Sequence, residues 1–333
     1  MATRDGQLTQ ELLLSTLRQI DDPTGTGARK LMTRSFRELR EAFSLFAEYP
    51  DSMKVSIFGS ARTPADHPDY AAAVDFSRQM ADLGWLVITG AGDGIMKAGH
   101  EGPGAAGSFG LSIQLPFETS ANSVIAGNEK LLKFRYFFTR KLIFLSSCQA
   151  VVAFPGGFGT QDELLEVLTL IQTGRGALVP IVLVAGPDSS YWPHWERYVR
   201  EELLTRGFIA QSDLELYYVA QDPADAAAHI EQFYANYHSS RYVRDDLVIR
   251  IKHALSNDQM AALNEEFGGV VRSGRIVQRA AFAVEEDVLH LPRIVFTHTR
   301  RDYAIVRRLI DRINSFPITA RNHAGRTWRA PQF

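Results

Sequence analysis

The chain has 333 residues, with 36 basic and 38 acidic side chains and a formal net charge of −2 at pH 7. A charge this balanced gives no general field that would attract nucleic acid or an anionic membrane. No apolar run approaches the roughly 18 residues of a membrane helix, and residues 1–7 lack the apolar core of a signal peptide. We therefore expect a cytoplasmic protein of two domains, or of one large domain with extensions.

The numbers and positions of cysteine and histidine argue against disulfides, a cysteine nucleophile and a metal site. The single cysteine, Cys148, excludes an internal disulfide framework. It lies between a predicted helix end and an apolar run, which favours a buried, unreactive thiol over a nucleophile. The nine histidines include no HExxH pair and have no cysteine partner, so we expect no metal site.

Two helices are expected in an N-terminal helical segment, residues 1–50. Apolar residues recur at helical spacing over residues 8–20, and again over residues 29–48, where Arg and Glu lie among them. The segment shows no residues with evident chemistry. We expect it to pack on the core or on another subunit.

Residues 51–238 alternate between apolar runs and amphipathic stretches. This alternation predicts right-handed βαβ units and an α/β fold with a doubly wound, Rossmann-like parallel sheet. The predicted helix at 129–147 is strongly basic and would place Lys133 and Arg140 near one face. Strands are predicted at 55–58, 85–89, 109–115, 150–154, 179–184 and 214–219, and the other main helices at 69–83, 164–171, 188–204 and 223–237.

After residue 238 the pattern changes to a small C-terminal α+β extension, residues 239–333. An arginine-rich stretch near its end has the composition of a solvated helix face. Strands are predicted at 247–251, 276–282 and 293–297, and helices at 257–267 and 302–313.

Three glycine-containing turns follow predicted strands of the core. They begin at Gly59-Ser60, at residues 90–94 and at Pro155. Ligands of doubly wound sheets bind outside the carboxyl ends of the strands. The three turns should therefore converge on one crevice, bordered by the loop after Leu115.

The third turn, residues 155–163, has the sequence Pro-Gly-Gly-Phe-Gly-Thr-Gln-Asp-Glu between a strand and a helix. Its glycines allow close approach of the backbone to a ligand, and a helix N-terminus favours an anion. Asp162 and Glu163 are expected in the first helical turn, where they would repel a phosphate. They either complement the helix dipole or act on another part of a phosphorylated molecule.

Two common nucleotide-binding fingerprints are absent. The turn at Gly59 has one glycine instead of G-x-G-x-x-G, and the turn at residues 90–94 is G-x-G-x-G. The chain also has no G-x-x-x-x-G-K-[ST] phosphate loop. Neither dinucleotide binding of the usual kind nor a Walker phosphate loop is indicated.

Taken together, these residues resemble the Lonely Guy (LOG) family, often labelled "lysine decarboxylase-like". The resemblance covers about residues 53–220 and is carried by the P-G-G-x-G-T-x-x-E motif of residues 155–163. Further matches are the Arg140-Lys141 pair, the upstream turns at Gly59-Ser60 and residues 90–96, and a loop comprising residues 115–118 and Asn122.

The resemblance implies hydrolysis of the N-glycosidic bond of nucleoside 5′-monophosphates, giving free base and ribose 5-phosphate without a cofactor. It implies Arg140 and Glu163 as the catalytic pair and residues 157–160 as the phosphate site. It also implies a homodimer or a larger homo-oligomer. The implied substrate-binding residues are Gly59, Ser60, Gly92, Gly94, Lys141, Gly156, Gly157, Gly159 and Thr160.

Departures from the family pattern leave alternatives open. Ala91 and Asp93 interrupt a glycine run, and residues 137–139 differ from the Met-His-x of plant-type members. A purine or pyrimidine nucleotide nucleosidase, such as an AMP nucleosidase, is therefore as compatible as a cytokinin ribotide hydrolase. A non-catalytic nucleotide-sensing protein is the further alternative. A decarboxylase would need a pyridoxal phosphate lysine, and nothing around Lys141 marks one.

Overall fold

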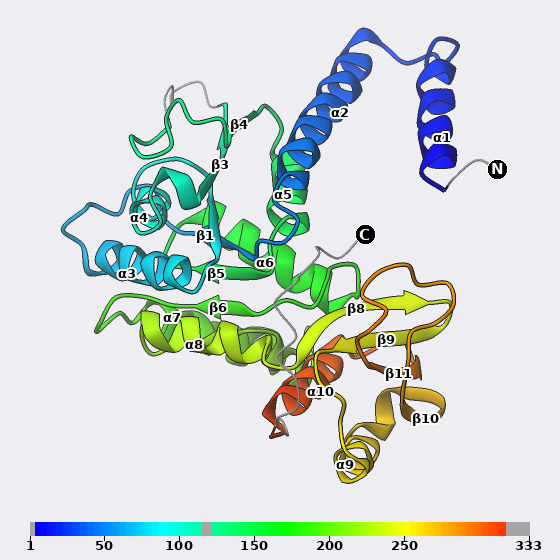
Figure 1. The fold of residues 1–333 in the computed structure, drawn as a ribbon. Helices are drawn as coiled ribbons and strands as arrows, with labels where there is room; N and C mark the ends of the chain where they lie inside the picture. Colours follow the sequence, from blue (N-terminus) through cyan, green and yellow to red (C-terminus); the bar gives the residue numbers. More distant parts are fainter. Residues whose placement is uncertain (1–3, 115–120, 318–333) are drawn as a thin grey trace.

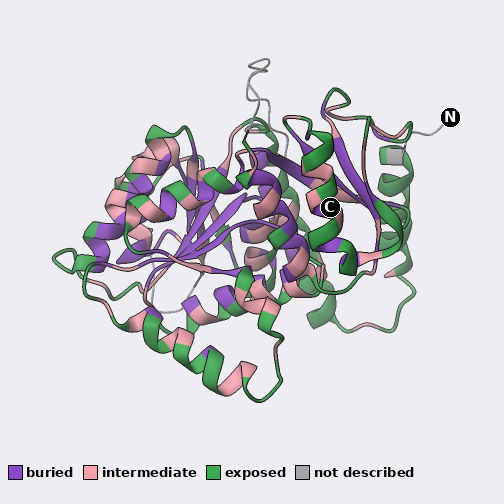
Figure 2. Cartoon of the chain, turned by 90° about the horizontal axis from the view of Figure 1, so that it is seen from below, coloured by how far each residue is buried: buried purple, intermediate pink, exposed green. Residues whose placement is uncertain are grey.

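The computed structural model describes residues 4–114 and 121–317. Within these ranges, a seven-stranded sheet has the order β4-β3-β2-β1-β5-β6-β7, and every neighbouring pair is parallel. Helices surround the sheet (Figure 1), and its strands are buried between them (Figure 2). The predicted α/β, Rossmann-like fold is confirmed.

The strand order reverses at the centre of the sheet. Val55 of β1 pairs with Val87 of β2 on one side and with Ala150 of β5 on the other. The crevice of a doubly wound sheet forms at such a reversal. The strands are β1 (Lys54–Phe58), β2 (Leu86–Thr89), β3 (Ser108–Ile113), β4 (Leu131–Phe134), β5 (Ala150–Ala153), β6 (Ile181–Leu183) and β7 (Tyr218–Val219).

Several helices begin at caps that the sequence supplies. The side chain of Asp222 accepts a hydrogen bond from the backbone N–H of Asp225 at 2.8 Å, and Pro223 occupies the first turn. Helix α7 continues into a π-helical stretch, and β7 is preceded by a 3₁₀ helix. The helices around the sheet are α3 (Pro68–Asp82), α4 (Ile95–Glu101), α5 (Phe137–Ser146), α6 (Phe158–Gln172), α7 (Tyr191–Tyr198) and α8 (Pro223–Phe233).

The predicted long helix at 129–147 is wrong. Its first half is β4, which pairs in parallel with β3 and buries Phe134, and only its second half is helical, as α5. The free edge of β3 offers backbone hydrogen bonds that outweigh local helix propensity. Lys133 therefore lies on a strand and shares no helix face with Arg140.

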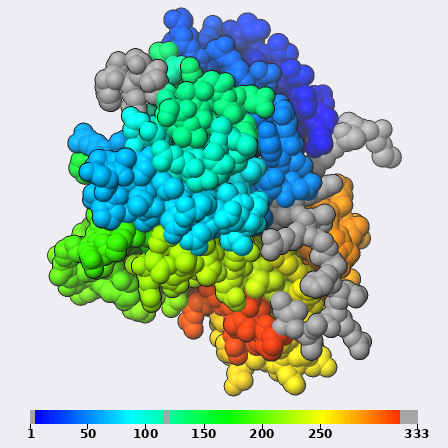
Figure 3. Space-filling view, turned by 60° about the vertical axis from the view of Figure 1, so that its left-hand side comes forward, coloured from blue at the N-terminus to red at the C-terminus, as the bar shows by residue number. Residues whose placement is uncertain are grey.

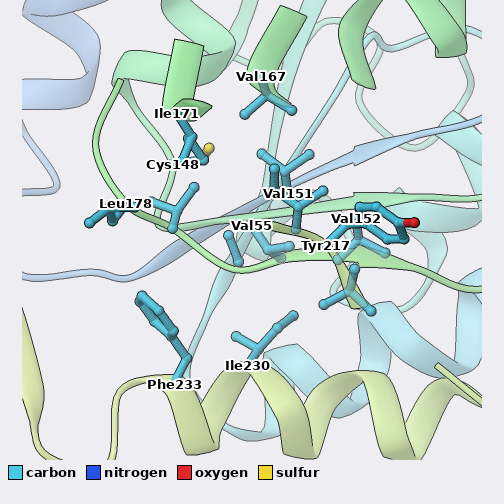
Figure 4. Close-up of a cluster of buried hydrophobic side chains, with 14 of the residues drawn as sticks. Val55, Cys148, Val151, Val152, Val167, Ile171, Leu178, Tyr217, Ile230 and Phe233 are labelled. Atoms are coloured by element: carbon cyan, nitrogen blue, oxygen red, sulfur yellow. The ribbon is translucent and has the colours of Figure 1, made fainter. Parts of the chain in front are cut away.

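The core consists of apolar side chains buried between the central strands and the helices on both faces of the sheet. Val151 and Val152 of β5 lie between Val167 of α6 on one side and Ile230 of α8 on the other (Figure 4). All four are at most 3% exposed. Burial of each such side chain stabilises the fold by about 1.5–3 kcal/mol, so β5 is held firmly at the centre.

A second sheet is antiparallel and has the order β10-β11-β9-β8. Strand β8 was not predicted, and its first residue, Tyr237, is the last residue of the helix expected at 223–237. Ile249 and Phe296 of this sheet belong to the same buried cluster as Val55. Its elements are β8 (Tyr237–Val243), β9 (Asp246–Ile251), α9 (Asn257–Phe267), β10 (Val271–Arg279), β11 (Arg293–His298) and α10 (Tyr303–Ser315).

The N-terminal segment forms the two predicted helices, α1 (Arg4–Arg18) and α2 (Thr26–Ala47). The end of α2 packs on the body, where Phe46 stacks on Phe109 with ring centroids 4.8 Å apart. The rest of α2 and all of α1 extend away from the sheet (Figure 1). No helix in the two described ranges has both the length and the apolar content that a membrane crossing requires.

Candidate active site

A cavity of about 1210 Å³ opens at the carboxyl ends of β1 to β5. All three glycine turns contribute to it, so their predicted convergence is confirmed. The predicted border at residues 115–120 lies outside the described residues. The predicted site residues that line the cavity are Gly59, Ser60, Gly92, Arg140, Gly156, Gly157, Gly159, Thr160 and Glu163.

Backbone hydrogen bonds connect the turns to one another. The N–H of Ser60 donates to the carbonyl of Pro155 at 3.1 Å, and the N–H of Ile95 donates to the carbonyl of Ser60 at 3.0 Å. Gly94 has φ +59°, and a Cβ there would lie 2.3 Å from the Ser60 oxygen. Gly94 does not line the cavity. It allows the first and second turns to approach each other.

The third turn leads directly into α6. Helix α6 begins at Phe158, and within the described chain no side chain caps its N-terminus. Its first N–H groups are therefore available to an anion. A Cβ on Gly156 would lie 2.1 Å from Oγ1 of Thr160, so only glycine fits this tight approach.

The expectation that Asp162 and Glu163 lie in the first helical turn is wrong. Because α6 already begins at Phe158, both residues fall in its second turn. Favourable interaction of acids with the helix dipole declines after the first turn. The dipole therefore does not account for Glu163, which is 3% exposed and lines the cavity.

Glu163 and Arg140 lie next to each other in the lining of the cavity. Their atoms Oε1 and Nη2 are 3.8 Å apart. The guanidinium of Arg140 lies near the rings of Phe137 and Phe144, at 5.4 and 5.5 Å from the centroids. Among the described residues, Oε2 of Glu163 is buried without a hydrogen-bond partner. A buried carboxylate oxygen of this kind is suited to accept a hydrogen bond from a ligand or water.

Burial raises the pKa of Glu163 to about 7, although the charges of Lys141 and Arg140 act in the opposite direction. The two contacts are 3.8 Å long, so neither cation donates a good hydrogen bond that would compensate for burial. A carboxyl group with a pKa near neutrality can exchange a proton in either direction under physiological conditions. Such a shift in a cavity is typical of active sites.

Lys141 connects α5 to α6. Its Nζ lies 2.8 Å from Oδ2 of Asp162 and 2.7 Å from Oε2 of Glu166. Burial lowers the pKa of Lys141, but the hydrogen bonds to these two carboxylates outweigh it and raise the pKa. The same Nζ is 3.8 Å from Glu163. Lys141 is thus the one predicted site residue besides Gly94 that does not line the cavity.

Side chains from α7 support the third turn, and sequence reasoning missed them. The hydroxyl of Tyr191 donates to the carbonyl of Gly156, and Nε2 of Gln161 donates to that hydroxyl at 2.7 Å. Trp195 donates to Oε1 of Gln161 at 2.9 Å. Nothing in the sequence signals these contacts, because α7 lies more than 25 residues after the turn.

A buried polar network supports the second turn. The side chain of Asn122 donates to the carbonyl of Gly92 at 2.9 Å, and its backbone N–H donates to the carbonyl of Ala91 at 2.8 Å. His100 is fully buried beside Asn122 and lies 2.9 Å from Oγ1 of Thr89. Burial lowers the pKa of His100. Asn122 could be found from the sequence because it belongs to the family-like loop after Leu115, whereas nothing in the sequence marks His100 as part of the site.

The N-terminal segment also contributes to the site, through Glu38 of α2. One carboxylate oxygen accepts from the backbone N–H of Arg135 at 2.8 Å, and the other accepts from the hydroxyl of Thr139 at 2.5 Å. These bonds hold the beginning of α5, which carries Arg140. Cys148, by contrast, is buried and takes no part, as predicted.

Residues 90–230 match a protein-family model described as "Possible lysine decarboxylase". This segment includes the second and third glycine turns, Arg140 and Glu163. The chain is similar to this family over that segment. The predicted family resemblance is therefore confirmed over that segment.

A curated relative of this domain is the "Probable cytokinin riboside 5'-monophosphate phosphoribohydrolase LOG4" of Oryza sativa subsp. japonica. The match is 31% identical over 109 residues, which are 31% of this chain and 46% of the relative. The chain thus matches less than half the length of that relative. The shared segment alone does not define a substrate.

Solved structures with a similar domain were also found. The molybdenum cofactor carrier protein of Chlamydomonas reinhardtii aligns with 54% of this chain and 97% of its own, at 22% identity and a TM-score of 0.40. DNA processing protein A of Helicobacter pylori aligns with 55% of this chain and 81% of its own, at 13% identity and a TM-score of 0.38. Neither likeness bears on the chemistry of this chain.

Proposed function

We propose that the protein hydrolyses the N-glycosidic bond of nucleoside 5′-monophosphates to free base and ribose 5-phosphate. The observation that carries this proposal is the pairing of Glu163 with Arg140 in the cavity that also holds the uncapped N-terminus of α6. One end of the site suits a phosphate and the other suits a sugar that becomes positively charged. The name of the rice relative supports the same activity.

In the proposed reaction, the first N–H groups of α6 bind the 5′-phosphate. The oxygen of a water molecule forms a bond to C1′ of the ribose, and the bond from C1′ to the base nitrogen breaks. The electron pair leaves with the base, which takes up a proton from the surrounding water, and Glu163 later returns its proton to that water. Ionised Glu163 accepts a proton from the water and stabilises the positive charge on the ribose.

Arg140 has two possible duties in this scheme, because its guanidinium can donate either to the phosphate or to the departing base. The substrates proposed are purine and pyrimidine nucleotides, with cytokinin ribotides among them. The cavity of about 1210 Å³ has room for a substituted base. General acid–base assistance of this kind is worth roughly 10²–10⁴ in rate.

The test is incubation of the purified protein with AMP, GMP, CMP and a cytokinin ribotide, followed by chromatography of the free bases. We expect base and ribose 5-phosphate in equal amounts from at least one nucleotide. Adenosine is the control, and it should be a poor substrate because it lacks the phosphate. Nucleotide binding without base release from any of them would indicate the sensing alternative instead.

The printed family description suggests lysine decarboxylation, which needs a lysine that forms a Schiff base with pyridoxal phosphate. Lys141 does not fit that role. Its ammonium group is held by Asp162 and Glu166, and those bonds favour its protonated, non-nucleophilic form. We therefore assign no decarboxylase chemistry to Lys141.

A further inference from the structure

Three cationic side chains line the cavity among the described residues, and each is a candidate partner of the 5′-phosphate. They are Arg62, Lys133 and Arg140. A phosphate monoester carries a charge of about −1.5 to −2 at neutral pH. Because Asp162 and Glu163 line the same cavity, a bound phosphate needs a cation close to it to offset their repulsion.

Arg140 is engaged at the other end of the substrate. Its Nη2 lies 3.8 Å from Oε1 of Glu163, and its guanidinium lies near the rings of Phe137 and Phe144. Its side chain is only 14% exposed. In the proposed reaction Glu163 acts at C1′ of the ribose. Arg140 beside it is therefore placed at the glycosidic bond and the departing base.

Lys133 is too distant from the start of α6 to share a phosphate with it. It lies on β4, whereas the third glycine turn follows β5, and the order β4-β3-β2-β1-β5 puts four strand spacings between them. Neighbouring strands are about 4.8 Å apart, so β4 and β5 are separated by roughly 19 Å. Lys133 therefore belongs to the opposite end of the cavity.

Arg62 follows β1, the direct neighbour of β5, so its turn lies one strand spacing from the third turn. The two turns are in contact. The backbone N–H of Ser60 donates to the carbonyl of Pro155 at 3.1 Å, and a Cβ on Gly156 would lie 3.0 Å from the nitrogen of Ser60. Arg62 is two residues beyond this contact, on the strand end closest to the start of α6.

The backbone at Arg62 is fixed, while its side chain is available to a ligand. Its N–H donates to Oγ of Ser60 at 3.1 Å, a hydrogen bond typical of serine turns. The side chain is exposed and makes no ion pair or hydrogen bond with the described residues. Since Oγ of Ser60 accepts from Arg62, its own O–H proton can be donated to a phosphate oxygen.

We propose that Arg62 is the side-chain ligand of the 5′-phosphate, beside the backbone N–H groups of α6. The proposal rests on the function proposed above, and it assigns Arg140 to the departing base. A guanidinium presents paired N–H donors that match two phosphate oxygens, so arginine is well suited to this role. Arg62 then favours nucleoside monophosphates over nucleosides, because only the former present a phosphate to it.

The first test measures binding of ligands that contain no glycosidic bond to a base. Ribose 5-phosphate and inorganic phosphate are titrated into the full-length protein by calorimetry. Arg62→Met keeps a long side chain without the charge, and we expect it to raise the Kd of ribose 5-phosphate about 10–100-fold, as for other hydrogen bonds to charged groups. Arg62→Lys keeps the charge but loses the paired donors, so its affinity should lie between the two.

Salt dependence separates a direct contact with the phosphate from a merely structural role. Because salt screens an exposed charge pair, the affinity of the natural chain for ribose 5-phosphate should fall with added KCl, and it should fall less steeply in Arg62→Met. The matched control is Arg308→Met, which removes the same charge from an exposed arginine of α10. Helix α10, in red, lies at the lower end of the molecule in Figures 1 and 3, apart from the blue-to-cyan segment that carries β1. Its affinity and salt dependence should be natural.

Kinetics then separates the two arginines. With the nucleotide that the natural chain hydrolyses, Arg62→Met should raise KM more than it lowers kcat, whereas Arg140→Met should mainly lower kcat and keep its affinity for ribose 5-phosphate. Thermal unfolding checks that each variant is folded.

Three outcomes would overturn the proposal. They are natural affinity for ribose 5-phosphate in Arg62→Met, no binding of this ligand by the natural chain at millimolar concentration, and loss of its binding in a folded Arg140→Met. Failure of the proposed function looks different. The natural chain would then release no base from any nucleotide, while Arg62→Met would still weaken the binding of ribose 5-phosphate.

Discussion

Replacement of Glu163 by glutamine tests the electrostatics of the site without any substrate. The pKa of the Glu163 carboxyl group is raised from 4.5 to about 7 by burial. A raised carboxyl pKa means that the folded state binds more protons than the unfolded state between these two values. The stability of the natural protein therefore falls as the pH rises through this window. Glutamine mimics the protonated form at every pH and removes that loss.

The size of the effect follows from the two pKa values. Each unit of difference corresponds to about 1.36 kcal/mol. Linkage then gives a stability advantage for Glu163→Gln of about 1 kcal/mol at pH 5 and about 3 kcal/mol at pH 8. For 333 residues the unfolding entropy is about 0.7 kcal/mol per degree. If the chain unfolds as one unit, the Tm of the variant exceeds that of the natural protein by about 1 °C at pH 5 and about 4 °C at pH 8.

The assay is thermal unfolding of both proteins in matched buffers from pH 5 to pH 8. The control is Glu166→Gln, which removes a partly exposed carboxylate one turn further along α6. Its Tm difference should not grow with pH in the same way. A Glu163→Gln difference that is constant across the pH range would refute the raised pKa. A variant that is less stable at pH 8 would show that the contact with Arg140 outweighs the cost of burial.

Further predictions concern turnover and the glycine turn. If the proposed reaction is correct, turnover should rise with pH through about 7, because that reaction uses the ionised form of Glu163. Glu163→Gln should keep nucleotide binding but lose roughly 10²–10⁴ of the rate. Lys141→Met should move the rising limb of the pH–rate profile to higher pH, because the charge of Lys141 lowers the pKa of Glu163. KM should change little, since Lys141 does not line the cavity. Lys141→Arg keeps the positive charge and should retain most of the natural profile. Gly156→Ala should lower the free energy of unfolding by about 1–3 kcal/mol and weaken phosphate binding, because the new Cβ would overlap Thr160. Gly157→Ala is the matched control in thermal unfolding, because a Cβ at that position meets no atom within 4 Å.

The sequence was informative where structure depends on local pattern. Alternating apolar runs and glycine turns were sufficient to predict the sheet and the convergence of the turns. The sequence failed at residues 129–147, where the strand Leu131–Phe134 exists only because β3 offers an edge for pairing. Tyr191, His100 and Glu38 were missed for the same reason. Each supports the site through a contact with a residue that is distant in sequence, and no local pattern records such a contact.

Arg140 and Glu163, the proposed catalytic pair, could be named from the sequence because both belong to family-like motifs, while their environment could not. Arg140 lies on the helix before β5 and Glu163 on the helix after it, so one short strand joins them. The four residues of β5, Ala150–Ala153, are fully buried at the point where the strand order reverses. Burial between α6 and α8 fixes this strand, and the distance between the two side chains is fixed with it. The opposite end of the cavity is lined from β3 and the edge strand β4, which has a neighbour on one side only. Changes there can alter the fit of a base without disturbing Arg140 and Glu163, so we expect base preference to be set at the β4 end and catalysis at the β5 end.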